Sequence, residues 1–323
     1  MRMPRIKAEE GKAGLYHCMS RIVGGEFLLG ECEKEMFVRM MWRVAAFLGI
    51  EILDYVVMSN HYHQLVRVPG VIKVSDIELM QRLKEYYGAE SLEVLLYEDA
   101  LVKGGEALAS LKQYHVKRMG DVSEFEKILK QGFSVWYNRR KDRRGTLWME
   151  RFKSVLVEDT LEARQVMATY LDLNSVRAEM VIDPKDYRFC GYAAAIAGDK
   201  RCREGIKEIM GISNFRKAAS VYRVKLFQRG SKTVRGKTGA FSREQLLETL
   251  ESGGNLSATE LVRLKVRYFS DGLVLGSQLF VEEVFERHRS HFGEKRKSGS
   301  RRIRGLAGSR LRVIRDLKLN PIT

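Results

Sequence analysis

Hydrophobic and polar positions in the first 70 residues follow the two periods that distinguish strands from helices. Residues 15–22, 50–58 and 61–68 are apolar runs with loose alternation, which predicts three strands. Residues 33–48 place apolar side chains every three or four positions, as an amphipathic helix does, and Gly49 ends that helix. The order strand, helix, strand, strand is the opening half of a ferredoxin-like β-α-β-β-α-β unit with an antiparallel sheet.

The next segment predicts the rest of this unit after an insertion. Residues 77–128 read as polar, amphipathic helices broken at glycines, so we expect a helical insertion over about 74–133. Residues 154–158 predict a fourth strand, and Thr160 is a candidate N-cap for a helix that runs to about residue 173. We expect this helix to complete the unit within a first domain of residues 1–197.

The remainder of the chain, residues 198–323, has a different composition and predicts a mostly helical, basic region for DNA binding or an accessory role. Its tail, residues 295–318, is dense in Arg and Lys and is interpreted as a second nucleic-acid contact. The fold class predicted for the whole chain is therefore α+β. The helices expected in this region span residues 214–229, 242–252, 259–268 and 277–291, the last with Ser277 as N-cap.

Charge narrows the choice of partner. The 323 residues include 57 Lys and Arg against 41 Asp and Glu, a formal net charge of +16, which favours nucleic acid before membrane lipid. The most apolar stretch, residues 44–58, contains Glu51 and Asp54 and is too short to span a bilayer. No secretory signal is recognised at the N-terminus, and the four cysteines form no Cys-x-x-Cys pair. We therefore expect reduced thiols, a cytoplasmic location and no membrane partner.

Two histidines stand out inside the third predicted strand, in the segment MSNHYHQLV. Residues i and i+2 of a strand point to the same face, so His61 and His63 lie side by side while Tyr62 faces away. Binding of one metal ion is a natural use of this geometry. The alternative, with comparable weight on spacing alone, is a pair of sheet histidines that hydrogen-bond to neighbours or water.

A second candidate pair lies at the end of the last predicted helix, in TYLDLNSVRAEMV. Tyr170 and Asn174 are four residues apart, which places them on one helical face. Asn offers a carbonyl oxygen to a cation and Tyr offers a phenol. The alternative is that both residues serve packing and capping, which is more common for such a pair.

Three segments together resemble a known family. MSNHYHQLV, FSVWYNRRKDRRGTLWMERFKSVLVED and YLDLNSVRAEMV occur in the order and at the separations typical of single-tyrosine HUH transposases, and specifically of REP-associated tyrosine transposases. The resemblance covers about residues 13–195. Two positions depart from the family pattern: Ser175 stands in place of Pro and Glu179 in place of Gly. Both follow the reactive positions, so they bear on local turn geometry more than on chemistry.

The resemblance implies an HUH nuclease fold and a chemistry. It implies that His61, His63 and Asn174 bind Mg²⁺ or Mn²⁺ and that Tyr170 is the nucleophile of a DNA transposase. Attack by the phenolate on single-stranded DNA beside a short hairpin would leave a 5'-phosphotyrosine, which can be passed to another 3'-end. A monomer or homodimer in the bacterial cytoplasm, associated with the nucleoid, is expected.

Basic residues between the two motifs are the predicted DNA contacts. They combine phosphate-binding side chains with an aromatic stacking surface, although a solvated charged loop is the alternative for such a run. Tyr137, in WYNRR, is the chief rival to Tyr170 and is interpreted as packing or facing DNA. The predicted DNA contacts are Arg139, Arg140, Lys141, Arg143, Arg144, Trp148, Arg151 and Lys153.

Two other functions compete with a nicking and strand-transfer enzyme. A domesticated nucleic-acid-binding regulator would keep the fold and the basic surface without turnover, but it would not need His61, His63, Tyr170 and Asn174. An RNA-binding protein with a ferredoxin-like sheet would stack bases on sheet aromatics, and this strand offers histidines instead.

Overall fold

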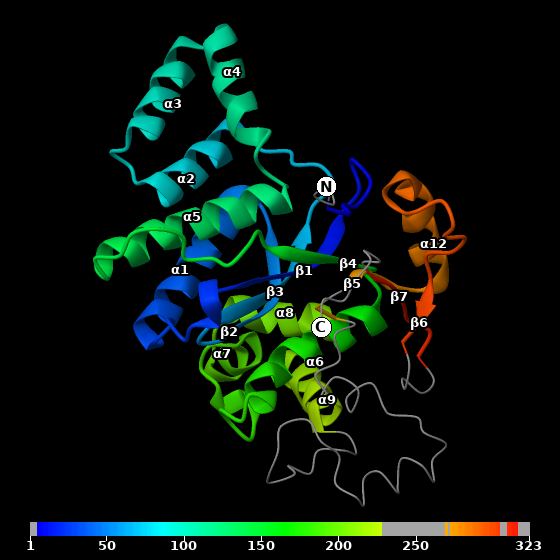
Figure 1. Cartoon of the computed structure of the whole chain (residues 1–323). Coiled ribbons are helices and arrows are strands. Elements are labelled where there is room, and N and C mark those ends of the chain that lie inside the picture. Colours follow the sequence, from blue (N-terminus) through cyan, green and yellow to red (C-terminus); the bar gives the residue numbers. More distant parts are fainter. Residues whose placement is uncertain (1–4, 228–268, 271, 304–308, 316–323) are drawn as a thin grey trace, which may run out of the picture.

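The computed structural model describes residues 5–227, 269–270, 272–303 and 309–315, and it is built around one mixed sheet (Figure 1). Seven strands follow the order β2-β3-β1-β4-β5-β7-β6. They are β1 (Gly14–Arg21), β2 (Glu51–Val57), β3 (His61–Val68), β4 (Lys153–Val157), β5 (Gly272–Gly276), β6 (Arg301–Arg302) and β7 (Arg312–Arg315).

The first four strands form the predicted antiparallel unit. β1 pairs antiparallel with both β3 and β4, and β2 pairs antiparallel with β3. β1 and β2 therefore run parallel, as do β3 and β4, and parallel strands need a crossover connection, usually a helix. α1 (Glu31–Leu48) supplies the first crossover and α5 (Val122–Arg140) the second. This confirms the α+β fold class and the ferredoxin-like order.

The second helix of the unit is not the one predicted. We expected the helix after the fourth strand to complete the unit, but a helix that follows β4 cannot be the crossover that leads into β4. α5 has that role and packs beside α1, so the insertion consists of the three helices before it. They are α2 (Asp76–Tyr87), α3 (Leu92–Lys103) and α4 (Gly105–Val116).

The opposite face of the sheet carries α6 (Leu161–Arg177), which contacts β2 and β3 (Figure 1). Its N-cap Thr160 accepts a hydrogen bond from the Ala163 amide, as predicted from the sequence. Because α6 crosses this face, its side chains contact the side chains of β1 and β3 that project from the same face of the sheet. Three further helices cover this side: α7 (Gly191–Ala197), α8 (Lys200–Met210) and α9 (Phe215–Phe227).

The C-terminal region, predicted to be mostly helical, also adds three strands to the sheet that were not predicted. β5 pairs parallel with β4, and β7 joins β5 to β6. Pairing satisfies backbone groups that β4 would otherwise expose at the edge of the sheet. α12 (Gln278–Arg287) begins at its predicted N-cap Ser277. The helices predicted over 242–252 and 259–268 lie outside the described residues.

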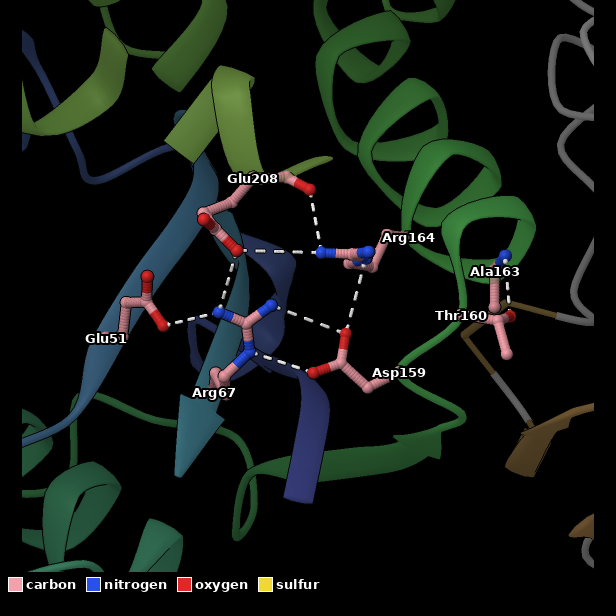
Figure 2. A network of polar contacts seen from close by, with 7 residues as sticks. All are labelled: Glu51, Arg67, Asp159, Thr160, Ala163, Arg164 and Glu208. Atoms are coloured by element: carbon pink, nitrogen blue, oxygen red, sulfur yellow. Dashed lines mark hydrogen bonds and ion pairs between the residues drawn. The ribbon is translucent and has the colours of Figure 1, made fainter. Parts of the chain in front are cut away.

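An ion-pair network ties α6 to the sheet and to α8 (Figure 2). Arg67, at the end of β3, contacts Glu51 at 2.7 Å, Asp159 at 2.8 Å and Glu208 at 3.2 Å. Arg164 of α6 reaches the same Asp159 carboxylate at 3.3 Å and donates to the Glu208 carbonyl at 2.7 Å. The start of α6 is therefore anchored at several points, which sets where its second half lies over the sheet.

Candidate active site

A hollow of about 550 Å³ opens on the sheet face that α6 covers. It lies where the end of β1, the start of β3 and the second half of α6 meet, beside the loop that leads into β4. His61, His63, Tyr170 and Asn174 all line it. The residues predicted for catalysis and metal binding, which come from segments far apart in the sequence, are thus brought together in one place.

The histidine pair has the side-by-side arrangement that a strand dictates. The ring centroids of His61 and His63 are 5.1 Å apart. Tyr62 lies on the other face, where its ring packs against Phe37 and its hydroxyl donates to Glu126. The alternation predicted from the sequence is therefore present at this position.

Hydrogen bonds decide which nitrogen of His63 carries the proton. A carbonyl oxygen can only accept, so His17 Nδ1, 2.9 Å from the Phe269 carbonyl, is the donor. Burial lowers the pKa of His17 to about 4, so its ring is neutral near pH 7 and Nε2 can only accept. His63 Nδ1, 2.9 Å from that Nε2, is then the donor, and His63 Nε2 keeps its lone pair.

His61 is set in the same tautomer by its sequence neighbour. The amide nitrogen of Asn60 donates to the Gly25 carbonyl at 3.0 Å, which leaves the amide oxygen facing His61 Nδ1 at 2.6 Å. Burial, and then the positive charges of Arg21 and Arg177, lower the pKa of His61 to about 4. Both rings of the pair therefore present an unprotonated Nε2, the state in which histidine binds a metal ion.

Tyr170 and Asn174 face the hollow from successive turns of α6. The Asn174 amide nitrogen donates to the carbonyl oxygens of Tyr170 and of the residue after it, at 3.0 and 3.2 Å. The Tyr170 ring is edge-on to His17 and His63, with centroids 5.6 Å from each, and lies 5.2 Å from Phe269. The phenol is thus placed beside the histidine pair in a largely enclosed setting.

Arg177 is a site residue that the sequence reasoning did not single out. Its guanidinium carbon lies 4.3 Å from the centre of the Tyr170 ring, and it donates to the Tyr170 carbonyl at 3.0 Å. A cation in this position stabilises negative charge on a phenolate or a phosphate. The signal was present in YLDLNSVRAEMV, because Arg177 lies seven residues after Tyr170 and so on the same helical face.

The predicted basic residues divide into two groups. Arg151 and Lys153 line the hollow, together with Arg21 and Arg177, and Glu150 is the one carboxylate among the described residues that line it. The hollow therefore carries excess positive charge and suits an anion. The others occupy the end of α5 and the loop after it, outside the hollow; they are Arg139, Arg140, Lys141, Arg143 and Arg144.

Two aromatic residues of this region belong to the core. Trp148, predicted as a stacking surface, is 7% exposed, packs against Tyr62 and donates its indole N–H to the Lys130 carbonyl at 3.1 Å. This corrects the prediction, because packing under α5 outweighs the basic sequence around the tryptophan. Tyr137 is also buried and packs against Phe133, so it does not compete with Tyr170.

The residues present fit a hard divalent cation in part. No cluster of three or more His, Cys, Asp or Glu side chains able to hold a metal ion occurs in the described ranges. A set of His61, His63 and Asn174 is not such a cluster, since its third member is an amide. Two imidazole lone pairs and an amide oxygen leave coordination positions for phosphate oxygens, which such a cation prefers.

Comparison with known proteins finds similarity only among solved structures, and it is distant. No family model matches the chain, and no curated protein matches it. Among solved structures, the chain is similar to a REP-associated tyrosine transposase bound to a REP hairpin, at 16% sequence identity and a TM-score of 0.39. The match covers 61% of this chain and 87% of that chain.

Among the helices of the described residues, none has the length and apolar composition that a membrane span needs.

Proposed function

We propose that this protein nicks and rejoins single-stranded DNA near short hairpins through a 5'-phosphotyrosine on Tyr170. The observation that carries the proposal is the meeting of a tyrosine with two histidines that present free Nε2 lone pairs, in one basic hollow. Neither a packing tyrosine nor a pair of structural histidines requires that combination. The three sequence motifs that resemble tyrosine transposases contain His61, His63 and Tyr170.

The reaction is a transesterification. The Tyr170 phenol oxygen forms a bond to phosphorus while the bond from phosphorus to the 3'-oxygen breaks. The 3'-oxygen gains a proton and the phenol loses one, so the balance needs no water and no ATP. The reverse reaction with another 3'-hydroxyl rejoins a strand, which makes the enzyme a transferase rather than a hydrolase.

The side chains in the hollow have separate roles in this reaction. His61, His63 and Asn174 would hold Mg²⁺ or Mn²⁺, which when bound polarises a phosphate oxygen and offsets the charge that builds on it. Arg177 stabilises the phenolate over which it lies, and the positive charge of Arg151 attracts the DNA backbone. A phosphate can approach the sheet face only when its strand is not base-paired there, which favours single-stranded DNA.

The test uses a hairpin oligonucleotide from the DNA that flanks the gene, with a single-stranded extension and Mn²⁺ or Mg²⁺. We expect a covalent adduct with the fragment on the 3' side of the cut, seen on a denaturing gel and abolished by EDTA. Tyr170→Phe should abolish the adduct while DNA affinity changes less than threefold. Tyr137→Phe, which alters a core tyrosine, is the matched control and should keep the adduct. An adduct that persists in Tyr170→Phe would show that Tyr170 is not the nucleophile.

One observation favours a second function. Tyr170 is 6% exposed and His63 is 5% exposed, so the reactive groups are largely covered. A regulator that binds hairpins without turnover would have no need to expose them. Salt-dependent hairpin binding with no metal-dependent adduct, on an oligonucleotide that contains the cleavage site, would favour that function.

A further inference from the structure

A second hollow, of about 630 Å³, lies on the opposite face of the sheet, at the β2 edge. We call it the arginine cleft. Its walls are the outer face of α1, the end of α2, Tyr55 of β2, the loop before α7 and the start of α8. It shares no lining residue with the hollow around Tyr170. Its volume is in the range of roughly 300–1,000 Å³ that is usual for small-ligand sites.

Arginines in the cleft lie over aromatic rings at distances typical of cation–π contacts. The guanidinium carbon of Arg201 lies 4.5 Å from the centre of the Trp42 ring. Two more pairs surround the same hollow: Arg43 lies 5.3 Å from the Tyr86 ring and Arg188 lies 5.5 Å from the Phe189 ring. A guanidinium over a ring keeps its outer face available, while its N–H groups already have partners here: Arg201 binds Asp199 and Arg43 donates to the Tyr86 carbonyl.

The cleft carries a small excess of positive charge. Five arginines and two glutamates line it, and two of the arginines pair with carboxylates beside it, Arg82 with Glu78 and Arg201 with Asp199. Arg188 pairs with Glu35, whereas Arg39 makes no ion pair or hydrogen bond within the described residues. The side chain of Arg188 is 66% exposed, so its ion pair is open to exchange with another anion. A solvated charged surface would carry similar arginines, but it would not need three of them over aromatic rings around one hollow.

We propose that the arginine cleft binds one or two unpaired nucleotides of a single-stranded DNA segment outside the cleavage site. Phosphates bind Arg39 and the exposed Arg188, and bases stack on the faces of the arginine–aromatic pairs. Aromatic rings and guanidinium groups gathered around one hollow favour a nucleic acid over an acidic peptide, which offers anions but no bases. The proposal rests on the DNA binding of the proposed function and not on its chemistry.

The first measurement maps where bases lie. Tyr170→Phe protein, which cannot form the adduct, is irradiated with a hairpin oligonucleotide that carries 5-iodouracil at successive single-stranded positions. We expect at least one position to cross-link to a peptide that contains Trp42 or Tyr86, identified by mass spectrometry. Cross-links confined to peptides of the hollow around Tyr170 would overturn the proposal.

The second measurement separates phosphate contacts from stacking. Arg39→Gln with Arg188→Gln should weaken binding about tenfold at low salt and reduce the slope of log K against log salt by about 1.4, the value for two lost single-strand phosphate contacts. Arg216→Gln with Lys217→Gln, two exposed residues of α9, is the charge-matched control and should change affinity less than threefold. Equal effects of the two double variants would overturn the proposal.

Further outcomes show whether the cleft binds nucleotides or anions of any kind. An abasic site at the cross-linking position should weaken binding about fivefold. If it does not, and polyglutamate displaces the DNA, the cleft binds anions of any kind and the proposal fails. Cross-links in the cleft without any metal-dependent adduct in the parent protein would refute the proposed chemistry but support nucleotide binding in the cleft. No binding of any single-stranded DNA would refute both.

Discussion

At the scale of single residues, the state of His63 depends on groups outside its own strand. His17 lies on β1, two residues before Met19, which pairs directly with His63, so both histidines point to the same face. Their hydrogen bond, and the one from His17 to the Phe269 carbonyl, hold the His63 proton on Nδ1. A buried partner of this kind orients a metal-binding histidine and increases its basicity.

Replacing His17, which does not line the hollow, should therefore change which nitrogen of His63 carries the proton. We expect nitrogen-15 NMR of the parent protein to show His63 protonated at Nδ1, and His17→Phe to remove that preference. Because loss of such a partner typically costs about 10- to 100-fold in metal affinity, Mn²⁺ binding should weaken by that factor. His115→Phe replaces another buried histidine, one that lies away from this hollow, and should leave Mn²⁺ affinity unchanged. An unaltered His63 spectrum in His17→Phe would refute the role assigned to His17.

At the scale of elements, helices on the α6 side lie very close to the edge strand β2. Gly205 of α8 faces the backbone of β2, where a Cβ atom would overlap the Leu53 carbonyl oxygen. Gly191, at the start of α7, is similarly close to the Asp54 side chain. Glycine at these positions lets α7 and α8 cover a strand whose outer edge has no partner strand in the order of the sheet.

Gly205→Ala should push α8 away from β2. Overpacking against a backbone costs roughly 1–3 kcal/mol, which exceeds the gain of about 1 kcal/mol in helix propensity, so we expect a net destabilisation of about 1 kcal/mol in urea unfolding. Gly132→Ala is the matched control, because it also lies within a helix, α5, and its Cβ would meet no atom within 4 Å. That variant should be stabilised by about 0.5–1 kcal/mol. Stabilisation of both variants would contradict the close contact between α8 and β2.

At the scale of the whole molecule, one half-buried arginine links parts of the chain that the sequence separates widely. Arg67 is 20% exposed, whereas its three carboxylate partners are 38–48% exposed and come from β2, the loop just before α6, and α8 (Figure 2). Since α6 carries Tyr170 and Asn174, this network helps to set the position of the candidate nucleophile over the sheet. Partial exposure screens each pair, so the network contributes less than a fully buried one would.

Arg67→Met should lower the free energy of unfolding by about 1–2 kcal/mol, because three carboxylates lose a shared cation near one another. The loss should shrink at high salt, which screens the remaining charges. Lys103→Met breaks an exposed pair with Asp99 four residues earlier in α3 and should cost only about 0.3–0.5 kcal/mol. Equal losses in the two variants would mean that the network acts as ordinary surface charge.

Local periodicity alone predicted much of this molecule. Strand alternation predicted that His61 and His63 share one face of a strand, and helical spacing predicted that Tyr170 and Asn174 share one face of a helix. Both patterns follow from backbone geometry within a few residues. The strand, helix, strand, strand opening was recognised for the same reason. Within this unit the crossover helix was misassigned, because α5 and α6 are both regular helices and the choice between them depends on which strands run parallel.

Tertiary structure decided the partners of these residues. That His17 would meet His63 depends on the register between β1 and β3, and that Trp148 would be buried depends on the position of α5 over the sheet. The arginine cleft gathers side chains from five separate segments. A sequence determines which way a side chain leaves its own element, because that is local geometry. Which other side chains it meets depends on how the elements pack, and that is a property of the whole fold.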